Sequence, residues 1–279
     1  MNNYHTHTYR CKHASGDVAD YVEAARRAGL GELGFSDHTP LPDGRGSENR
    51  MDLDQLDGYF AALEAARRAE EAGRGGEEGG AAGGGRLRIL RGLECEWSTE
   101  YDSFIRDELL GRHELDYLVS GTHFYLRDGA WEDSAAIRQA TGLVAYAAHI
   151  ERSVASGLFA FIAHPDLYCM GYLAWDEDAR ACARDILAAA SAAKIPVEIN
   201  GYGMRKPHVR GPEGERWPYP HEGFWDLAAS YDIDVVVNSD AHRPIDTAAC
   251  LERGRDMAAK RGLKVLETLP GPVVPADAS

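Results

Sequence analysis

Short apolar runs that alternate with amphipathic helical stretches constrain the fold of this chain more than any other feature. The runs predict seven strands, namely the segment "NYHTH" near the start and residues 32–37, 87–97, 116–124, 159–164, 196–200 and 233–242. The stretches between them predict helices over Asp17–Gly29, from Leu53, within 133–157, from Glu177 and from Asp246. Such alternation favours a parallel sheet covered on both faces, and seven repeats favour a closed or nearly closed barrel over an open sheet.

Residues of metal-ligand types stand at the ends of six of these seven strands. The endings read "GFSDH", "RGLECE", "VSGTH", "FIAH" and "VVNSDAH", and the first strand carries "HTH". In β/α barrels the carboxyl ends of the strands and the loops after them build the active site, so we expect these side chains to meet at one mouth. The candidate ligands are His5, His7, His13, His38, Glu94, His123, His164, Asp240 and His242.

Each of these signals is weak when taken alone. A single histidine after a strand is usually a loop or core residue, and we therefore do not expect His149, His208 and His221 to be ligands. Alternation along a strand, however, places His5 and His7 on the same face. Independent accidents explain six similar strand endings poorly, so the pattern predicts a metal site.

The donor types narrow the choice of metal. Imidazole and carboxylate without a convincing thiolate suit zinc, manganese or iron. Nine candidates are too many for one ion, so we expect two or three divalent metal ions, with Glu94 or a hydroxide as a bridge. Such a cluster lowers the pKa of bound water and holds both the attacking and the leaving oxygen, which suits hydrolysis of a phosphate ester.

Composition limits the possible partners. The formal net charge of −15 argues against long nucleic acid, whereas bound divalent cations would let an acidic protein bind a small phosphorylated substrate. No stretch approaches the roughly 20 apolar residues of a membrane span, and the start resembles no signal peptide, so we expect a cytoplasmic protein. The five cysteines lack CxxC spacing and predict free thiols. Nothing in the pattern predicts an oligomeric state.

The same pattern suggests a single domain. Residues 1–270 form the predicted domain, and the segment "EEAGRGGEEGGAAGGG", residues 70–85, interrupts it as a flexible Gly/Glu-rich insertion. The pattern of apolar runs resumes after this segment, which favours an extended loop over a domain boundary. Residues 271–279 are a Pro-rich tail.

The motifs "HTHTYRCKH", "FSDH", "GLECE", "GTHF", "AHPD" and "NSDAH", taken in this order, resemble the PHP (polymerase and histidinol phosphatase) superfamily. Within it the chain is similar to stand-alone histidinol-phosphate phosphatases. The resemblance implies an α/β fold, a distorted TIM-like barrel of seven β/α units with a trinuclear metal centre at the carboxyl ends of the strands. It also implies that the chain converts L-histidinol phosphate and water to L-histidinol and phosphate in histidine biosynthesis, through a metal-bridging hydroxide.

The resemblance further assigns ligands to each ion. It implies a first ion held by His5, His7, Glu94 and Asp240, a second by Glu94, His123 and His164, and a third by His13, His38 and His242. Family members also tend to place an arginine after the sixth strand, which here is Arg205 in "NGYGMRKP". The planar guanidinium suits phosphate, so Arg205 is the predicted substrate-binding residue.

One departure from the family pattern keeps alternatives open. Family members commonly follow "HPDL" with basic residues, whereas this chain reads "HPDLYCMGYLAW". Either Arg205, Arg127 or a residue from elsewhere supplies the cation, or the chain hydrolyses another small phosphate or a nucleotide. A non-catalytic, metal-stabilised module is a further alternative. An amidohydrolase barrel would need a bridging lysine, and no lysine ends a predicted strand.

Overall fold

The computed structural model describes residues 1–72 and 86–269. The chain divides into two compact units. The first consists of Met1–Glu94, Glu100–Tyr117 and Ser239–Ala249, and the second of Cys95–Thr99, Leu118–Asn238 and the segment from Cys250 onward. Each unit is described by itself below.

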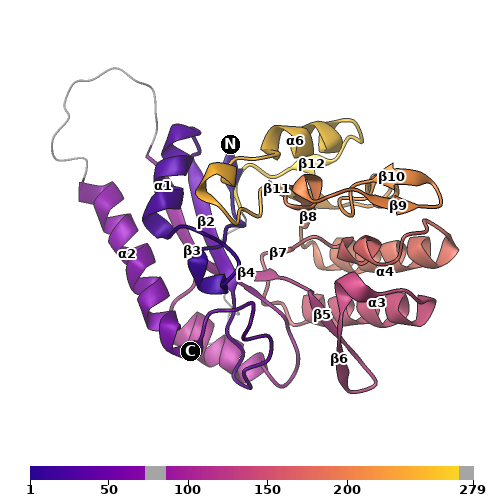
Figure 1. The fold of residues 1–279 in the computed structure, drawn as a ribbon, viewed down its shortest axis with the longest axis horizontal. Coiled ribbons are helices and arrows are strands. Elements are labelled where there is room, and N and C mark those ends of the chain that lie inside the picture. The colour runs from indigo at the N-terminus through magenta and orange to yellow at the C-terminus, as the bar shows by residue number, and fades with distance from the viewer. Residues whose placement is uncertain (73–85, 270–279) are drawn as a thin grey trace. The chain divides into compact units, whose positions relative to one another are not determined.

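The first unit is built around three parallel strands, drawn in indigo to violet in Figure 1. β1 (Asn2–Asn3) pairs with β2 (Glu32–His38), and β2 pairs with β3 (Arg88–Cys95) over its whole length. The helices that follow β1 and β2 are α1 (Val18–Arg27) and α2 (Leu56–Ala72), and they contact each other. A π-helix (Phe104–Arg112) follows β3.

Helix α1 shows how the local sequence starts an element. Asp17 caps the helix, and its own backbone N–H donates to Asp20 Oδ2 at 2.8 Å, which completes a reciprocal capping box. The buried face carries Val18, Tyr21 and other apolar residues at helical spacing, so the helix packs as the periodicity predicts.

The second unit is built around a further set of parallel strands. They lie in the order β4 (Tyr117–Ser120), β7 (Phe161–Ile162), β8 (Val197–Asn200), β11 (Asp234–Asn238) and β12 (Lys264–Val265). The helices are α3 (Ala140–Ala155), α4 (Glu177–Ala193), α5 (Glu222–Ala228) and α6 (Leu251–Ala259). Helices α3 and α4 run alongside each other and pack together (Figure 1).

The alternation of parallel strands with helices confirms the predicted α/β class, although several predicted bounds were wrong. The predicted first strand is shortened to Asn2–Asn3 and an isolated bridge at Thr6. The predicted strand 116–124 ends at Ser120, and Phe124 begins the antiparallel hairpin of β5 (Phe124–Arg127) and β6 (Ala130–Asp133). An Asp-Gly turn joins these two strands.

Other elements were also missed, and one predicted helix begins later than expected. A second antiparallel hairpin consists of β9 (Val209–Gly211) and β10 (Gly214–Arg216), and α5 and β12 were also absent from the prediction. The helix predicted from Asp246 begins at Leu251, because Pro244–Asp246 forms a separate 3₁₀ turn with proline at its first position.

Two predicted segments fall largely outside the described residues. Of the insertion at 70–85, only 70–72 are described, and they end α2; the tail at 271–279 is not described. Among the described residues, no helix is both long and apolar enough to cross a membrane. The predicted domain extent of 1–270 stays a prediction.

Candidate metal centre

The first residues of the chain lie between β2 and the segment that begins at Ser239. The backbone N–H of Ser36 donates to the carbonyl of Thr6 at 2.9 Å, and on the other side Thr6 forms a parallel bridge with Ala241. Because neighbouring residues alternate in extended chain, the residues that flank Thr6 share one face, and so do those that flank Ala241. This register brings together His5 and His7 from one segment with Asp240 and His242 from the other.

A buried asparagine fixes the same register. The Asn3 side-chain amide donates to Thr6 Oγ1 at 2.9 Å, to Ser239 Oγ at 2.8 Å and to the carbonyl of Thr247 at 3.1 Å. Its side-chain oxygen accepts the backbone N–H of Ser239 at 2.9 Å. The N-terminal segment is therefore held in place by side-chain hydrogen bonds as well as by the sheet.

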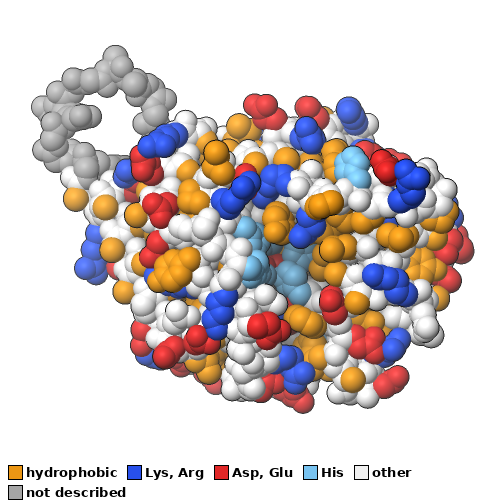
Figure 2. All heavy atoms as spheres, viewed as in Figure 1, with side chains coloured by type: hydrophobic (Ala, Val, Ile, Leu, Met, Phe, Trp, Pro, Cys, Tyr) orange, Lys and Arg blue, Asp and Glu red, His pale blue; other side chains and the backbone are white. Residues whose placement is uncertain are grey.

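Seven of the nine predicted ligands belong to the first unit. They are His5, His7, His13, His38, Glu94, Asp240 and His242. All of them except His13 are buried. Histidine side chains are visible on the face of the molecule that Figure 2 shows.

Four of these residues bring ligand atoms to the spacing that one ion requires. His5 Nε2 lies 3.3 Å from Glu94 Oε2 and 3.7 Å from Asp240 Oδ1. His7 Nε2 lies 3.5 Å and 3.3 Å from the same two oxygens. Ligand atoms at zinc distances in a tetrahedron stand about 3.4 Å apart, so this donor set fits a divalent cation.

Glu94 has a third histidine beside it. His38 Nδ1 lies 3.0 Å from Glu94 Oε2, the same oxygen that faces His5 and His7. One carboxylate oxygen surrounded by three imidazoles is placed to neutralise more than one cation. The bridging role that the family resemblance implies for Glu94, between the first and the second ion, stays a prediction.

A second set of histidines surrounds His242. The ring centroid of His242 lies 4.4 Å from that of His7 and 4.8 Å from that of His13. His13 Nδ1 lies 2.7 Å from the carbonyl of Cys11, and this contact turns His13 Nε2 toward His242 Nε2 at 3.0 Å. Ligand atoms of His7, His38 and His242 also lie within 4.8 Å of one another, which permits a shared ion.

The charge balance of the group favours a cation. Burial disfavours the imidazolium of His7, but the carboxylates of Asp240 and Asp37 outweigh it and raise the His7 pKa to about 9. Burial also disfavours ionised Asp240, yet the nearby imidazoles of His5 and His7 hold the Asp240 pKa well below its usual range. A proton on His7 therefore supplies positive charge that a bound metal would supply instead.

The second unit contains the other two predicted ligands, His123 and His164. Their ring centroids lie 4.8 Å apart, and His164 is buried whereas His123 is half-buried. Because Glu94 belongs to the first unit, the predicted second ion, with Glu94, His123 and His164 as ligands, stays a prediction.

A buried carboxylate that the ligand prediction left out orients His123. Glu96 Oε1 lies 3.0 Å from His123 Nδ1, and Glu96 is almost fully buried. A carboxylate on one ring nitrogen fixes the tautomer and leaves the other nitrogen for a metal. Its position two residues after Glu94, hence on the same face of an extended strand, was the sequence signal that could have identified Glu96.

Glu198 holds the backbone at His164. One of its oxygens accepts the backbone N–H of His164 at 3.0 Å and the side-chain amide of Asn200 at 2.8 Å, and the other accepts that of Asn238 at 2.9 Å. His164 has a φ of 28°, a conformation that costs on the order of 1–3 kcal/mol and needs support from its surroundings. The sequence suggested Glu198 as a contact for substrate or metal-bound water, and in the structure it accepts hydrogen bonds from His164, Asn200 and Asn238.

Asp240, in the first unit, has a similar backbone. Its φ of 49° is also left-handed, and it directly follows the buried segment after β11. Non-glycine residues in this region cluster at functional sites, so this conformation agrees with the predicted role of Asp240 as a ligand.

Arg205 lies in a 3₁₀ turn (Gly203–Arg205) after β8, as the family pattern leads one to expect. It is half-buried, and its guanidinium lies 5.4 Å from the ring centre of Tyr202. Its role in phosphate binding stays a prediction.

The turn after "HPD" is contacted by an arginine side chain from a different element. Leu167–Met170 forms a largely buried 3₁₀ turn, and Arg216 donates to the carbonyls of Cys169 at 3.0 Å and Leu173 at 3.2 Å. The guanidinium therefore reaches the segment that lacks the basic residues common in the family, and it donates its hydrogen bonds there to backbone carbonyls.

The three histidines that we did not expect to be ligands have other surroundings. His149 lies in α3, where its Nδ1 accepts the backbone N–H of Leu126 at 3.3 Å. His221 caps α5 and stacks on Trp175 with ring centroids 4.4 Å apart. His208 is exposed.

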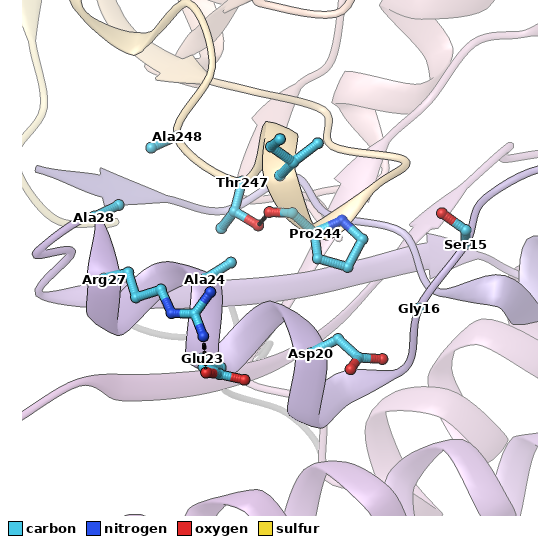
Figure 3. A pocket seen from close by; sticks show the side chains of 11 residues that line it. Ser15, Gly16, Asp20, Glu23, Ala24, Arg27, Ala28, Pro244, Thr247 and Ala248 are labelled. Atoms are coloured by element: carbon cyan, nitrogen blue, oxygen red, sulfur yellow. Dashed lines mark hydrogen bonds and ion pairs between the residues drawn. The ribbon is translucent and has the colours of Figure 1, made fainter.

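A hollow in the first unit lies beside α1, and its lining contains no histidine. Figure 3 shows α1 residues on one side of it and the loop from Pro244 on the other. Arg27 and Glu23 form an ion pair within it. The lining residues are Ser15, Gly16, Asp20, Glu23, Ala24, Arg27, Ala28, Pro244, Ile245, Thr247 and Ala248. The hollow therefore shares no residue with the histidine group.

Comparisons with known proteins give a family and a relative that match this chain. The model of the PHP domain matches residues 3–201. A protein of Deinococcus radiodurans that is inferred to be a histidinol-phosphatase is 33% identical over 249 residues, which is 86% of this chain and 85% of that protein.

Solved structures share the fold at lower sequence identity. A proposed histidinol phosphatase of Listeria monocytogenes has a TM-score of 0.68 at 20% identity, covering 88% of this chain and 97% of that one. The histidinol phosphate phosphatase of Lactococcus lactis subsp. lactis Il1403, complexed with zinc, L-histidinol and phosphate, has a TM-score of 0.69 at 16% identity, covering 96% of each chain. These likenesses confirm the predicted fold class, a distorted TIM-like barrel.

Proposed function

Because the chain belongs to the PHP domain family, we propose that it is a metal-dependent phosphatase that converts L-histidinol phosphate and water to L-histidinol and phosphate. The observation that carries this proposal is the buried set of His5, His7, Glu94 and Asp240, whose ligand atoms have the spacing of a divalent-cation site. The substrate is suggested by the Deinococcus radiodurans relative. As an enzyme of histidine biosynthesis, the protein would act in the cytoplasm.

We propose two or three divalent ions, with zinc, manganese or iron as candidates. Zinc is supported by the complex of the Lactococcus lactis structure, and imidazole and carboxylate donors suit all three metals. When bound, such ions supply Lewis acidity and lower the pKa of coordinated water, which is the chemistry of phosphoester hydrolysis.

The residues of the chain then have distinct tasks. His5, His7, Glu94 and Asp240 hold the first ion, and His13, His38 and His242 are the proposed ligands of another. Glu94 balances the charge of more than one ion, because three imidazoles face the same carboxylate oxygen. In the second unit, His123 and His164 are proposed ligands whose orientation Glu96 and Glu198 maintain.

Substrate binding is assigned to Arg205. A guanidinium offers parallel N–H donors that match two phosphate oxygens, so it would orient the phosphate without holding a metal.

The Arg205 assignment is tested by Arg205→Ala. We expect kcat/KM for L-histidinol phosphate to fall by about tenfold to a hundredfold with unchanged metal content, because a hydrogen bond to a charged group contributes about 1.5–3 kcal/mol. Arg210→Ala, which removes an exposed arginine paired with Glu215, is the matched control and should behave like the wild type. Wild-type kinetics in Arg205→Ala would remove this residue from the site.

One observation favours a second candidate, a phosphatase for another small phosphate or a nucleotide. The turn Leu167–Met170 carries no basic side chain, although family members commonly have basic residues after "HPDL". Phosphate release from amino-alcohol, sugar, nucleotide and aryl phosphates, measured alongside metal content, separates the candidates. Turnover of L-histidinol phosphate above all others supports the first, and turnover of other phosphates without it supports the second. A metal-loaded protein that hydrolyses none of them would instead be a non-catalytic module.

A further inference from the structure

Cys11 is a buried thiol beside the histidines of the first unit. Its sulfur and the ligand nitrogens of His13 and His242 lie within 4.8 Å of one another. The sulfur is equally close to the ligand atoms of His7 and Asp37. A thiolate binds metal ions strongly, and Cys11 lies close enough to the candidate histidines to be a ligand, although it is not among the ligands predicted from the sequence.

The local backbone brings Cys11 and His13 to the same side of a short turn. Cys11 ends the 3₁₀ turn Tyr9–Cys11, and Lys12 follows with a left-handed φ of 69°. His13 then folds back, and its Nδ1 lies 2.7 Å from the carbonyl of Cys11. Its Nε2 thereby faces His242 Nε2 at 3.0 Å, next to the sulfur.

His7 provides an independent sign of a ligand at this place. Its side chain has no exposed surface, and its ring nitrogens lie beside carboxylate oxygens, Nδ1 at 3.7 Å from Asp37 Oδ1 and Nε2 at 3.3 Å from Asp240 Oδ1, without a well-aligned hydrogen bond. A buried polar atom without a well-aligned partner costs about 1–3 kcal/mol, so the place between the His7 ring and these carboxylates is suited to a bound cation that takes the position of a proton. The ligand atoms of His7, Cys11 and Asp37 form one group within 4.8 Å.

We propose that Cys11 supplies a thiolate ligand to an ion held with His13 and His242. This inference rests on the proposed metal centre and adds thiolate to it as a third donor type, beside imidazole and carboxylate. On binding, the S–H bond breaks, a sulfur–metal bond forms and the proton leaves to solvent. A thiolate is a soft ligand that favours zinc or cobalt over manganese, so Cys11 makes this position selective.

Cobalt(II) tests the inference directly, because a cobalt–thiolate bond gives a charge-transfer band in the near ultraviolet and cobalt–imidazole bonds do not. We expect the full chain loaded with cobalt to show this band. Cys11→Ser and Cys11→Ala should abolish it. Cys182→Ala, which removes a buried thiol on α4, is the matched control and should keep the band.

Metal competition gives a second measurement. We expect the ratio of the zinc affinity to the manganese affinity to fall by about tenfold or more in Cys11→Ser. Substitutions around a bound metal commonly lower metal affinity by about tenfold to a hundredfold. An unchanged preference would contradict the inference.

The spectrum of the wild type decides the question even if the variants do not fold. Bound cobalt without a charge-transfer band overturns the role of Cys11, whereas phosphatase activity in the same sample leaves the proposed function standing. A protein that binds neither cobalt nor zinc overturns the role of Cys11, and one that binds no divalent metal at all overturns both proposals.

Discussion

The two units hold their candidate ligand histidines in different ways. In the first, oxygens of Glu94 and Asp240 lie directly among imidazole nitrogens at 3.0–3.7 Å. In the second, Glu96 contacts the ring of His123, and Glu198 accepts the backbone N–H of His164. Carboxylates of the first kind are placed to share a cation, and those of the second kind set the orientation of a ligand.

Glu94 and Glu96 show the difference most directly. They are two residues apart at the end of β3, they carry the same charge and both are buried. One faces His5, His7 and His38, whereas the other faces His123. The role of a carboxylate therefore depends on the partners that the fold brings to it.

The largest expected effect comes from Glu94→Gln. The substitution keeps the shape but removes the charge that balances the proposed cations, so metal occupancy should fall and turnover should decrease on the order of a thousandfold or more. Metal analysis and phosphate-release kinetics measure the two effects. The exposed Glu100→Gln is the control for the same chemical change. Full occupancy and turnover in Glu94→Gln would exclude Glu94 as a ligand.

A smaller effect is expected from Glu96→Gln. The amide can still accept a hydrogen bond from His123, but it lacks the negative charge that makes this imidazole a stronger metal ligand. Metal affinity or kcat/KM should therefore fall about tenfold to a hundredfold. Titration with zinc and steady-state kinetics measure these quantities. A loss as large as that of Glu94→Gln would break the distinction between the two glutamates.

The smallest effect concerns His149, a buried histidine that lies outside both ligand groups. Burial, with the charge of Arg152, lowers its pKa to about 4. Between pH 7 and pH 5 the unfolded chain takes up a proton at this residue and the folded protein does not, so stability falls as the pH falls. From the unfolded pKa of 6.5, this residue contributes a loss of about 2 kcal/mol at pH 5.

His149→Gln should remove that part of the acid sensitivity. Urea unfolding at pH 7 and pH 5 measures it, and the exposed His208→Gln serves as the control. An equally steep loss of stability in His149→Gln and the wild type would show that His149 is protonated in the folded protein.

Local rules allowed part of the fold to be predicted. Asp17 starts α1 through a capping box, as its residue type and the following apolar periodicity indicated. The hairpins β5–β6 and β9–β10 were missed because each strand has only three or four residues, too few for a reliable periodic signal. The first strand was overestimated for a related reason. The segment that contains His5 and His7 has the sequence pattern of a strand. Of these residues, however, only Thr6, which lies between the two histidines, forms a bridge.

The sequence by itself determined the chemical types of the candidate ligands and their places after buried apolar runs, because strand periodicity and residue chemistry are local properties. The tertiary structure decided which of these side chains meet. The bridge between Thr6 and Ala241 places residues 5 and 240 beside each other, although they are far apart in the chain. It also decided that Glu94 faces three histidines, that Glu96 orients one, and that Cys11 lies beside His13 and His242. These contacts join distant segments, and no local pattern encodes their distances.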